Sequence, residues 1–289
     1  MLIPFRQALV AALLLCAVAA CSRPRLGPTA PGGQSRLELH VEGGPGPTVV
    51  FESGLGDGAS VWKGVAARLP QTFRQVSYDR PGYGWSRSTA QPRDPAAIAR
   101  DLHAALQARA VPPPYLLVGH SLGGLYVQAF ARLFPGETAG LVLVDPTHPD
   151  QWTRMQVEAP TDHRVVSALS MLFPRHMRAE FEASKDAAAW RRLPPLPPQL
   201  PAVVLSAEES SMGESAQFKN LKRALQTETA ASIPGAAHLW IRSPHYIQKH
   251  RPEAVAEAVA GVAGRTRAAQ AALTPGGGAP PPAPAGRYQ

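Results

Sequence analysis

Short apolar runs rich in β-branched residues recur along the chain, and each is bounded by glycine, proline or polar residues. They begin at Thr48 (TVVFESG), Arg74 (RQVSYDRPG), Tyr115 (YLLVGHS), Ala139 (AGLVLVDP) and Pro201 (PAVVLSAEE). Runs of this length are typical of strands buried on both faces, as the central strands of a parallel sheet are. The pattern therefore predicts a sheet that is covered by helices on both sides.

Helical patterns separate these runs. In DPAAIARDLHAALQARA, Asp94 is the expected N-cap and Pro95 takes the first helical position, while apolar residues recur along one face. Further helices are expected over 122–134 and 252–264, each bounded by proline or glycine. Strands alternating with helices predict an α/β fold with a doubly wound, mostly parallel sheet.

Length and charge restrict the domain count and the partners. A chain of 289 residues, 45% of them apolar, is long enough for one main folded domain, which we place at 36–267. The net charge of +8 comes from scattered basic residues without a run of like charges, which argues against a nucleic-acid partner. Cys16 and Cys21 are the only cysteines, so the folded region has neither a disulfide nor a thiolate metal site.

The first residues have the pattern of an export signal. Arg6 precedes an apolar run over 8–20 that is too short to span a bilayer comfortably. The letters VAAC, which end at Cys21, resemble the bacterial lipobox, in which the cysteine is acylated and becomes the new N-terminus. We expect a lipoprotein signal peptide over 1–20 and an exported protein of the cell envelope, anchored to a membrane by lipid on Cys21. An ordinary secretory signal is the alternative.

Three further segments have distinct compositions. Residues 21–35 are rich in Pro, Gly and Ser, as in a flexible tether, and residues 268–289 form a Pro/Gly/Ala-rich tail that is expected to be disordered. Residues 150–200 lose strand character and are expected to form a small helical cap. Several cap residues either line an acyl pocket or form the buried face of the cap: Trp152, Met155, Met171, Phe173 and Met177.

The motif GHSLG at 119–123 is a G-x-S-x-G placed directly after a predicted strand and directly before a predicted helix. This is the context of a nucleophile elbow, a turn so tight that only small residues fit beside the serine. The strained backbone of such a turn holds the serine hydroxyl clear of the sheet. Ser121 is therefore the predicted nucleophile.

Three motifs in this order resemble the α/β-hydrolase superfamily, and the resemblance extends over essentially the whole folded region. They are FESGLGDGASVW from Phe51, YDRPGYGWS from Tyr78, and the G-x-S-x-G motif. The resemblance implies a sheet of the α/β-hydrolase type with a cap over the site. It also implies an oxyanion hole made by the backbone N–H groups of Leu55 and Leu122.

Three histidines lie between 235 and 252, and the resemblance implies which of them is the base. In the superfamily the base lies on the loop that leads into the final helix, and His245, followed by Pro252, resembles that pattern. His238 lies within or at the edge of a predicted strand. It is the alternative base, or else a structural histidine with buried partners.

The carboxylate of a triad in this fold lies between the serine and the histidine in chain order. At the usual position, after the strand at Pro201, the chain has Ser210, so this position departs from the pattern. Some members have the acid one strand earlier, where Asp145 ends the run LVLVD. Asp145 is the predicted acid, and Glu208 and Glu209 are the alternatives.

These residues predict a carboxylesterase-like serine hydrolase that acts on a small ester or related acyl substrate through an acyl-enzyme. A C–C bond hydrolase, a lactonase or an aminopeptidase would keep the same serine, whereas epoxide hydrolases and haloalkane dehalogenases of the fold use an aspartate nucleophile. A non-catalytic envelope lipoprotein that binds a ligand is the alternative from another class. Histidines and carboxylates lack the spacing of a metal site, so no metal or cofactor is predicted. The sequence does not predict an oligomeric state.

Overall fold

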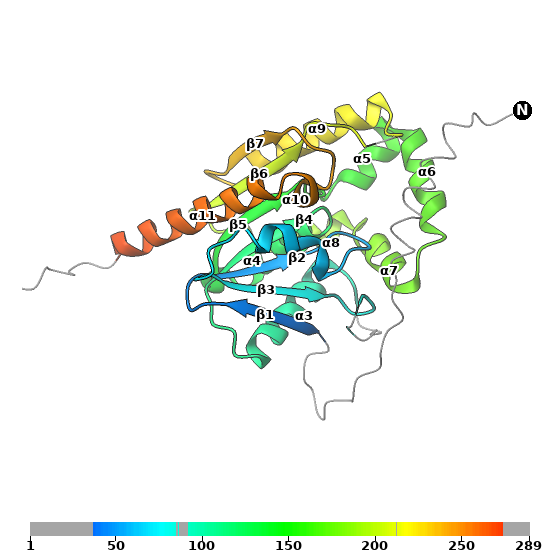
Figure 1. Ribbon diagram of the computed structural model, residues 1–289. Coiled ribbons are helices and arrows are strands. Elements are labelled where there is room, and N and C mark those ends of the chain that lie inside the picture. Colours follow the sequence, from blue (N-terminus) through cyan, green and yellow to red (C-terminus); the bar gives the residue numbers. More distant parts are fainter. Residues whose placement is uncertain (1–36, 85, 87–91, 212, 274–289) are drawn as a thin grey trace, which may run out of the picture.

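The computed structural model describes residues 37–84, 86, 92–211 and 213–273, so Cys21, the predicted signal peptide and the predicted tether lie outside the described residues. Seven strands form one sheet in the order β1-β3-β2-β4-β5-β6-β7, in which β1 is antiparallel to β3 and the other neighbours are parallel (Figure 1). The predicted fold class is confirmed. The strands are β1 (Glu38–Gly43), β2 (Thr48–Glu52), β3 (Arg74–Asp79), β4 (Tyr115–His120), β5 (Thr138–Val144), β6 (Ala202–Ala207) and β7 (Ala237–Ile241).

The edge strands β1 and β7 are not among the five apolar runs, and the sequence predicts no strand at all for β1. Its sequence, ELHVEG, alternates apolar and polar residues, and of its six residues Leu39 alone is buried. Alternation of this kind is typical of a half-exposed antiparallel strand at the edge of a sheet. A search for continuous apolar runs therefore passes over it.

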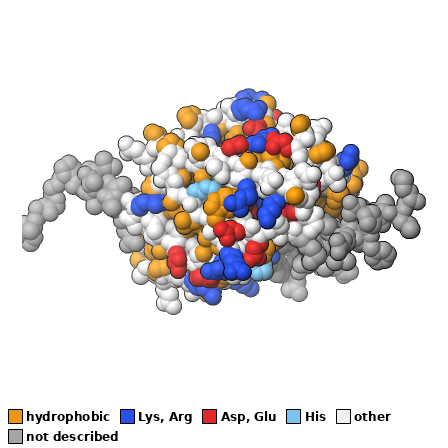
Figure 2. Space-filling view, turned by 90° about the horizontal axis from the view of Figure 1, so that it is seen from above, with side chains coloured by type: hydrophobic (Ala, Val, Ile, Leu, Met, Phe, Trp, Pro, Cys, Tyr) orange, Lys and Arg blue, Asp and Glu red, His pale blue; other side chains and the backbone are white. Residues whose placement is uncertain are grey.

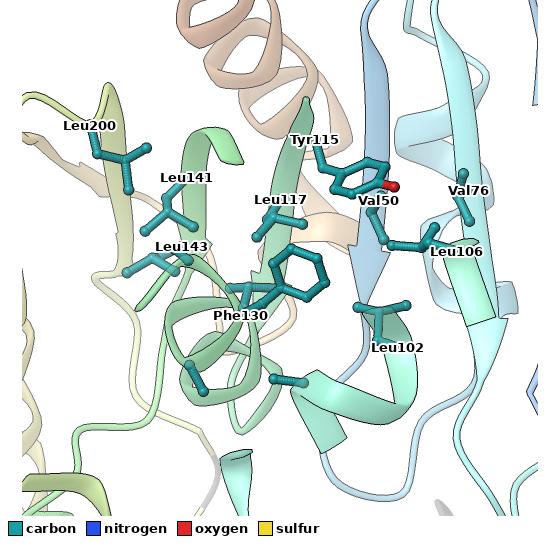
Figure 3. Packing of buried hydrophobic residues seen from close by; sticks show 14 of the residues in the cluster. Val50, Val76, Leu102, Leu106, Tyr115, Leu117, Phe130, Leu141, Leu143 and Leu200 are labelled. Atoms are coloured by element: carbon teal, nitrogen blue, oxygen red, sulfur yellow. The ribbon is translucent and has the colours of Figure 1, made fainter. Parts of the chain in front are cut away.

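Both faces of the sheet are covered, as the apolar runs predict. Alternate strand residues such as Val50, Leu117 and Leu143 pack with one helical layer, as Figure 3 shows, while their neighbours Val49 and Leu116 pack with the other. The first layer contains α3 (Pro95–Ala108), α4 (Gly123–Leu133) and α9 (Ala216–Ala231). The second contains α2 (Lys63–Ala66), α10 (Ile247–His250) and α11 (Pro252–Leu273).

The last helix extends past the expected end of the fold. We expected the domain to end at 267 and a disordered tail to begin at 268, but α11 continues to Leu273. Residues 267–273 are rich in alanine, the residue with the highest helix propensity, and this composition favours continuation of the helix. The Pro/Gly-rich part of the predicted tail, 274–289, lies outside the described residues.

Four helices between β5 and β6 form the segment that the sequence predicts as a cap. Of the apolar cap residues named in the sequence analysis, Met177 approaches the loop after β2, since its Cε would lie 3.3 Å from a Cβ placed on Gly56. Met155 instead packs against α9, and Met171 is 66% exposed, so neither faces that loop. The helices are α5 (Gln151–Glu158), α6 (Pro160–Ser170), α7 (Arg175–Ala183) and α8 (Ala187–Arg191).

Charged side chains of both signs are intermixed on the surface shown in Figure 2. One group of ion pairs in the described part of the chain joins the cap to α9, where Arg154 of α5 contacts Glu158 on its own helix and Glu228 on α9. The positive net charge is therefore not gathered into a single basic patch on this face. Within the described ranges, none of the helices combines the length and the apolar character needed to cross a bilayer.

Candidate active site

The turn from β4 to α4 holds Ser121 in a strained conformation. Its φ is 54°, in the left-handed region that residues with a side chain rarely adopt. A Cβ on Gly119 would lie 2.6 Å from the Gly123 carbonyl oxygen, and a Cβ on Gly123 would lie 2.5 Å from that of Glu52. The glycines of the G-x-S-x-G motif are therefore required by close backbone contacts on both sides of the serine.

Backbone hydrogen bonds from two neighbouring segments hold this turn. The Ser121 N–H donates to the Val144 carbonyl at 3.0 Å, while the Ser121 carbonyl accepts from the N–H groups of Gly124 and Thr147, both at 2.9 Å. Strain of this kind costs on the order of 1–3 kcal/mol and persists where the surroundings determine the geometry. The turn therefore presents the hydroxyl at the carboxyl edge of the sheet.

His245 lies on the loop between β7 and α10 and joins Ser121 to Asp145. Its Nε2 is 3.0 Å from Ser121 Oγ, and its Nδ1 is 2.6 Å from Asp145 Oδ2. A carboxylate only accepts hydrogen bonds, so Nδ1–H donates to Asp145 and Nε2 is left to accept the serine proton. The structure thus brings the three predicted triad residues together from three separate loops.

Asp145 directly follows β5 and is almost completely buried. Its Oδ1 accepts from the Ala207 N–H at 3.0 Å, and its Oδ2 lies 3.7 Å from the ammonium of Lys222. Burial raises the pKa of Asp145, but the hydrogen bond from His245, the charge of Lys222 and the Ala207 N–H outweigh burial and lower this pKa to about 2. The carboxyl group is therefore ionised at neutral pH and can orient the imidazole.

The structure does not bring the alternative acids to His245. Glu208 and Glu209 are both exposed, and Glu209 Oε1 lies 3.8 Å from Arg242 Nε. Their backbone N–H groups donate to the carbonyls of Ile241 and Ser243, which continues the pairing of β6 with β7. The predicted alternative of Glu208 or Glu209 as the acid has no contact to support it in the described part of the chain.

The alternative base, His238, has other partners. Its Nε2 is 2.9 Å from Ser206 Oγ, and Ser206 in turn donates to Gln226 Oε1 at 3.0 Å. Gln226 then donates to the Pro146 carbonyl at 2.8 Å. These bonds link β7, β6 and α9 on the side of the sheet that α9 covers. His238 therefore matches the structural histidine that the sequence left open.

Among the described residues, two backbone N–H groups near Ser121 have no acceptor. Neither Leu55 nor Leu122 donates its N–H to an acceptor in the described part of the chain. The loop that carries Leu55 lies against the serine, because a Cβ on Gly54 would be 3.3 Å from Ser121 Cβ. Unpaired donors next to a nucleophile can stabilise a developing oxyanion.

Two residues of the site were missed by the sequence analysis, and the first is His120. It is 1% exposed, and its Nε2–H donates to the carbonyl oxygen of His245 at 3.1 Å, while its Nδ1 lies 4.0 Å from Asp57 Oδ2. Burial, together with the neighbouring His245, lowers the pKa of His120 well below its usual value, so the ring is neutral. It anchors the backbone of the base. The motif leaves this position unspecified, so the sequence carries no signal for that role.

The second missed residue is Lys222 on α9. Its ammonium lies between Asp145 and Glu214, whose Oε1 is 3.1 Å away. Burial lowers the pKa of Lys222, but the two carboxylates outweigh burial and raise it, so the side chain stays charged. This positive charge favours the ionised form of Asp145. Nothing in the amphipathic pattern of α9 distinguishes this lysine from a solvated one.

The described residues form no metal-binding site. Among the residues that the structure describes, no group of three or more His, Cys, Asp or Glu side chains has the geometry to hold a metal ion.

The family comparison agrees with the fold. Residues 47–190 match the model of a family described as "alpha/beta hydrolase fold". The matched range includes Leu55, Ser121 and Asp145 and ends before His245.

Curated relatives match shorter stretches. An uncharacterized protein of Bacillus subtilis is 35% identical over 111 residues, which cover 38% of this chain and 44% of the relative. A putative carbamate hydrolase of Shigella dysenteriae is 38% identical over 100 residues, 34% of this chain and 44% of the relative. The match spans less than half the length of each of these relatives.

Solved structures resemble most of the described chain. A thermophilic esterase from Thermogutta terrifontis is 19% identical, with a TM-score of 0.55 over 80% of this chain and 93% of the esterase. An enol-lactonase from Burkholderia xenovorans is 21% identical, with a TM-score of 0.56 over 78% of this chain and 95% of the lactonase. At these identities the likeness shows the fold alone.

Proposed function

Because this chain belongs to the α/β-hydrolase superfamily, we propose that it is a serine hydrolase that cleaves an ester or a related acyl compound through an acyl-enzyme. The observation that carries the proposal is the hydrogen-bonded series from Ser121 through His245 to Asp145, at 3.0 and 2.6 Å, beside two free backbone donors. A fold that only bound a ligand would have no use for a strained serine with a base at hydrogen-bond distance.

In the acylation step, Ser121 Oγ attacks the acyl carbon while its proton passes to His245 Nε2. The ionised Asp145 stabilises the imidazolium that forms, and the N–H groups of Leu55 and Leu122 bind the negative oxygen of the tetrahedral intermediate. His245 then gives the proton to the leaving group, and the acyl group remains on Ser121.

Deacylation repeats these roles with water as the nucleophile. Water loses a proton to His245 Nε2 and attacks the acyl carbon, and the same N–H groups bind the second oxyanion. Collapse of this intermediate returns the proton to Ser121 and releases the acid. Apart from water, each step uses only the side chains of Ser121, His245 and Asp145 and the N–H groups of Leu55 and Leu122.

A fluorophosphonate probe and a panel of substrates test the proposed function. The folded protein should be labelled at Ser121 and should hydrolyse p-nitrophenyl esters, whereas Ser121→Ala should show neither reaction. Esters of increasing chain length, a lactone, an aminoacyl amide and a C–C bond substrate distinguish the esterase from the other serine hydrolases of the fold. A well-folded protein that is neither labelled nor active would favour the ligand-binding alternative.

Leu55 provides a test of the oxyanion hole. Leu55→Pro removes the N–H donor and should lower kcat by about 10²–10³-fold, the loss expected for one oxyanion donor. Leu55→Ala keeps the N–H and should retain kcat within about 3-fold, because the contribution comes from the backbone. Circular dichroism checks that both variants fold. Equal kcat in the two folded variants would exclude this donor.

We also propose that the protein is exported and anchored to a membrane through lipid on Cys21, which rests on the lipobox-like letters at 18–21. The mature wild-type protein should fractionate with membranes and incorporate a labelled fatty acid. Cys21→Ser should lose both properties and leave esterase activity unchanged, because the site lies in the folded domain. A Cys21→Ser protein that still carries label and stays with membranes would contradict the proposal.

A further inference from the structure

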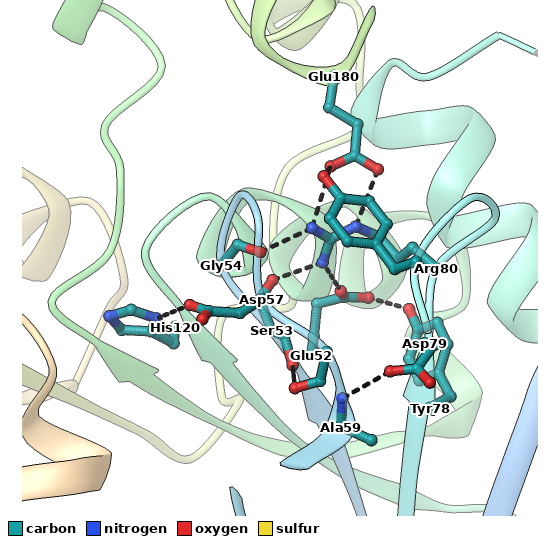
Figure 4. Close-up of polar contacts among 12 residues, drawn as sticks. Glu52, Ser53, Gly54, Asp57, Ala59, Tyr78, Asp79, Arg80, His120 and Glu180 are labelled. Atoms are coloured by element: carbon teal, nitrogen blue, oxygen red, sulfur yellow. Dashed lines mark hydrogen bonds and ion pairs between the residues drawn. The ribbon is translucent and has the colours of Figure 1, made fainter. Parts of the chain in front are cut away.

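The guanidinium of Arg80, in the loop after β3, is buried and fully bonded (Figure 4). Its five N–H groups have five acceptors at normal distances. Three acceptors are carboxylate oxygens, namely Glu52 Oε1 at 2.6 Å and both oxygens of Glu180 at 3.0 Å. The other two are the carbonyl oxygens of Ser53 and Gly54, at 2.6 and 2.7 Å.

The bond to the Gly54 carbonyl bears on the oxyanion hole. The Gly54 carbonyl and the Leu55 N–H belong to one peptide unit, which is planar and trans, so they point in opposite directions. Because Arg80 holds the carbonyl on one side of the peptide, the Leu55 N–H points to the opposite side. Gly54 of this loop lies beside Ser121, since a Cβ placed on it would be 3.3 Å from Ser121 Cβ. A cation on the carbonyl also polarises the peptide and strengthens the N–H as a donor.

The same guanidinium connects this peptide to the cap. Glu180 lies on α7 and is completely buried, and it binds Arg80 through both oxygens, Arg93 through Oε1 and the Tyr83 hydroxyl at 2.8 Å. Tyr83 in turn accepts a hydrogen bond from the Gly56 N–H at 3.4 Å. The seating of α7 and the conformation of the loop at 53–56 therefore depend on one set of bonds.

Stability alone does not account for this cluster. Two arginines, Arg80 and Arg93, face two glutamates, Glu52 and Glu180, all nearly without solvent contact. Buried ion pairs are often no more stabilising than well-packed apolar side chains, because desolvation offsets the attraction between the charges. What the cluster provides beyond stability is a defined geometry for the peptide groups that it holds.

We propose that Arg80 is a positioning residue that aims the Leu55 N–H at the oxyanion, and that Glu180 makes this alignment depend on the docked cap. The inference rests on the proposed serine hydrolase function. In this arrangement the alignment of the Leu55 N–H depends on the seating of α7 against the loop at 53–56, through the bonds of Glu180 to Arg80 and Tyr83.

Two substitutions in the full chain test this inference. Arg80→Lys keeps the charge but cannot bond both carbonyls and both glutamates, and Glu180→Gln keeps the shape but loses the charge that holds Arg80. Each should lower kcat for a p-nitrophenyl ester by about 10- to 100-fold with KM within about 3-fold, because the oxyanion exists only in the transition state. Labelling by the fluorophosphonate probe should slow in parallel, since its phosphoryl oxygen takes the oxyanion position.

Arg154→Met is the matched control. This substitution removes an arginine that, like Arg80, contacts two glutamates. Arg154 joins the cap to α9 and lies outside the Arg80 cluster. The kcat of this variant should equal that of wild type, even if the thermal midpoint falls. Wild-type kcat in folded Arg80→Lys and Glu180→Gln, with only lower midpoints, would overturn the inference.

Two further results of these experiments would also bear on the inference. If neither Arg80→Lys nor Glu180→Gln folds, Tyr83→Phe decides, because it removes a single hydroxyl between Gly56 and Glu180. A kcat lower by about 3- to 10-fold with unchanged KM supports the inference, and an unchanged kcat overturns it. A wild-type protein without turnover or labelling would instead contradict the proposed function itself.

Discussion

Replacing His245 with alanine should lower kcat for an ester substrate by about 10⁴- to 10⁶-fold, to about the level that Ser121→Ala leaves. The reason is that Nε2 of this ring is 3.0 Å from Ser121 Oγ and is the atom in reach that can take its proton. Triad members act as one unit, so the double variant should be no slower than either single variant. Steady-state kinetics on the two single variants and the double variant measure this directly.

His238→Ala is the matched control, since it removes a histidine of the same stretch. Its ring bonds Ser206 and is not in contact with Ser121, so kcat should stay near the wild-type value. The free energy of unfolding should fall by about 1–3 kcal/mol, because the Ser206 hydroxyl loses a buried partner. If His238→Ala abolished turnover in folded protein and His245→Ala retained it, the assignment of the base would be wrong.

Asp145→Asn should lower kcat by about 10⁴-fold with the fold intact. The carboxylate accepts from His245 Nδ1 at 2.6 Å and so keeps the proton off Nε2. An amide can donate to Nδ1 instead, which places the proton on Nε2 and leaves no acceptor for the serine proton. Glu208→Gln and Glu209→Gln, which change exposed carboxylates after β6, should stay within about 3-fold of wild-type kcat, because neither touches His245.

The same aspartate predicts a pH dependence of stability. The pKa of Asp145 is lowered from 3.8 to about 2 in the folded protein, so its ionised form stabilises the fold above about pH 4. That contribution, roughly 2 kcal/mol, should be lost as the pH falls from 4 through 2. Urea unfolding of wild type and Asp145→Asn should therefore show a difference that shrinks over this range. A difference that is constant from pH 6 to pH 2 would contradict the ionised, buried Asp145.

Local sterics explain why the nucleophile was evident in the sequence. A tight turn from strand to helix needs glycine on both sides of the serine, and the contacts of Gly119 and Gly123 with neighbouring backbone show that demand. Continuous apolar runs likewise identified the buried parallel strands, because burial on both faces removes polar alternation. The alternating edge strand β1 was missed for the same reason.

By itself, then, the sequence determined the features that depend on neighbours along the chain: the α/β alternation, the elbow at Ser121 and the order of the motifs. Only the tertiary structure showed that Asp145, and neither of the two glutamates after β6, contacts His245, because that contact depends on which loop ends beside His245. It alone placed Lys222 beside Asp145 and paired Arg80 with Glu180, 100 residues apart in the chain. Contacts of this kind form where the carboxyl ends of the strands lie beside helices from distant parts of the chain. The local sequence does not encode which charged side chains become buried there.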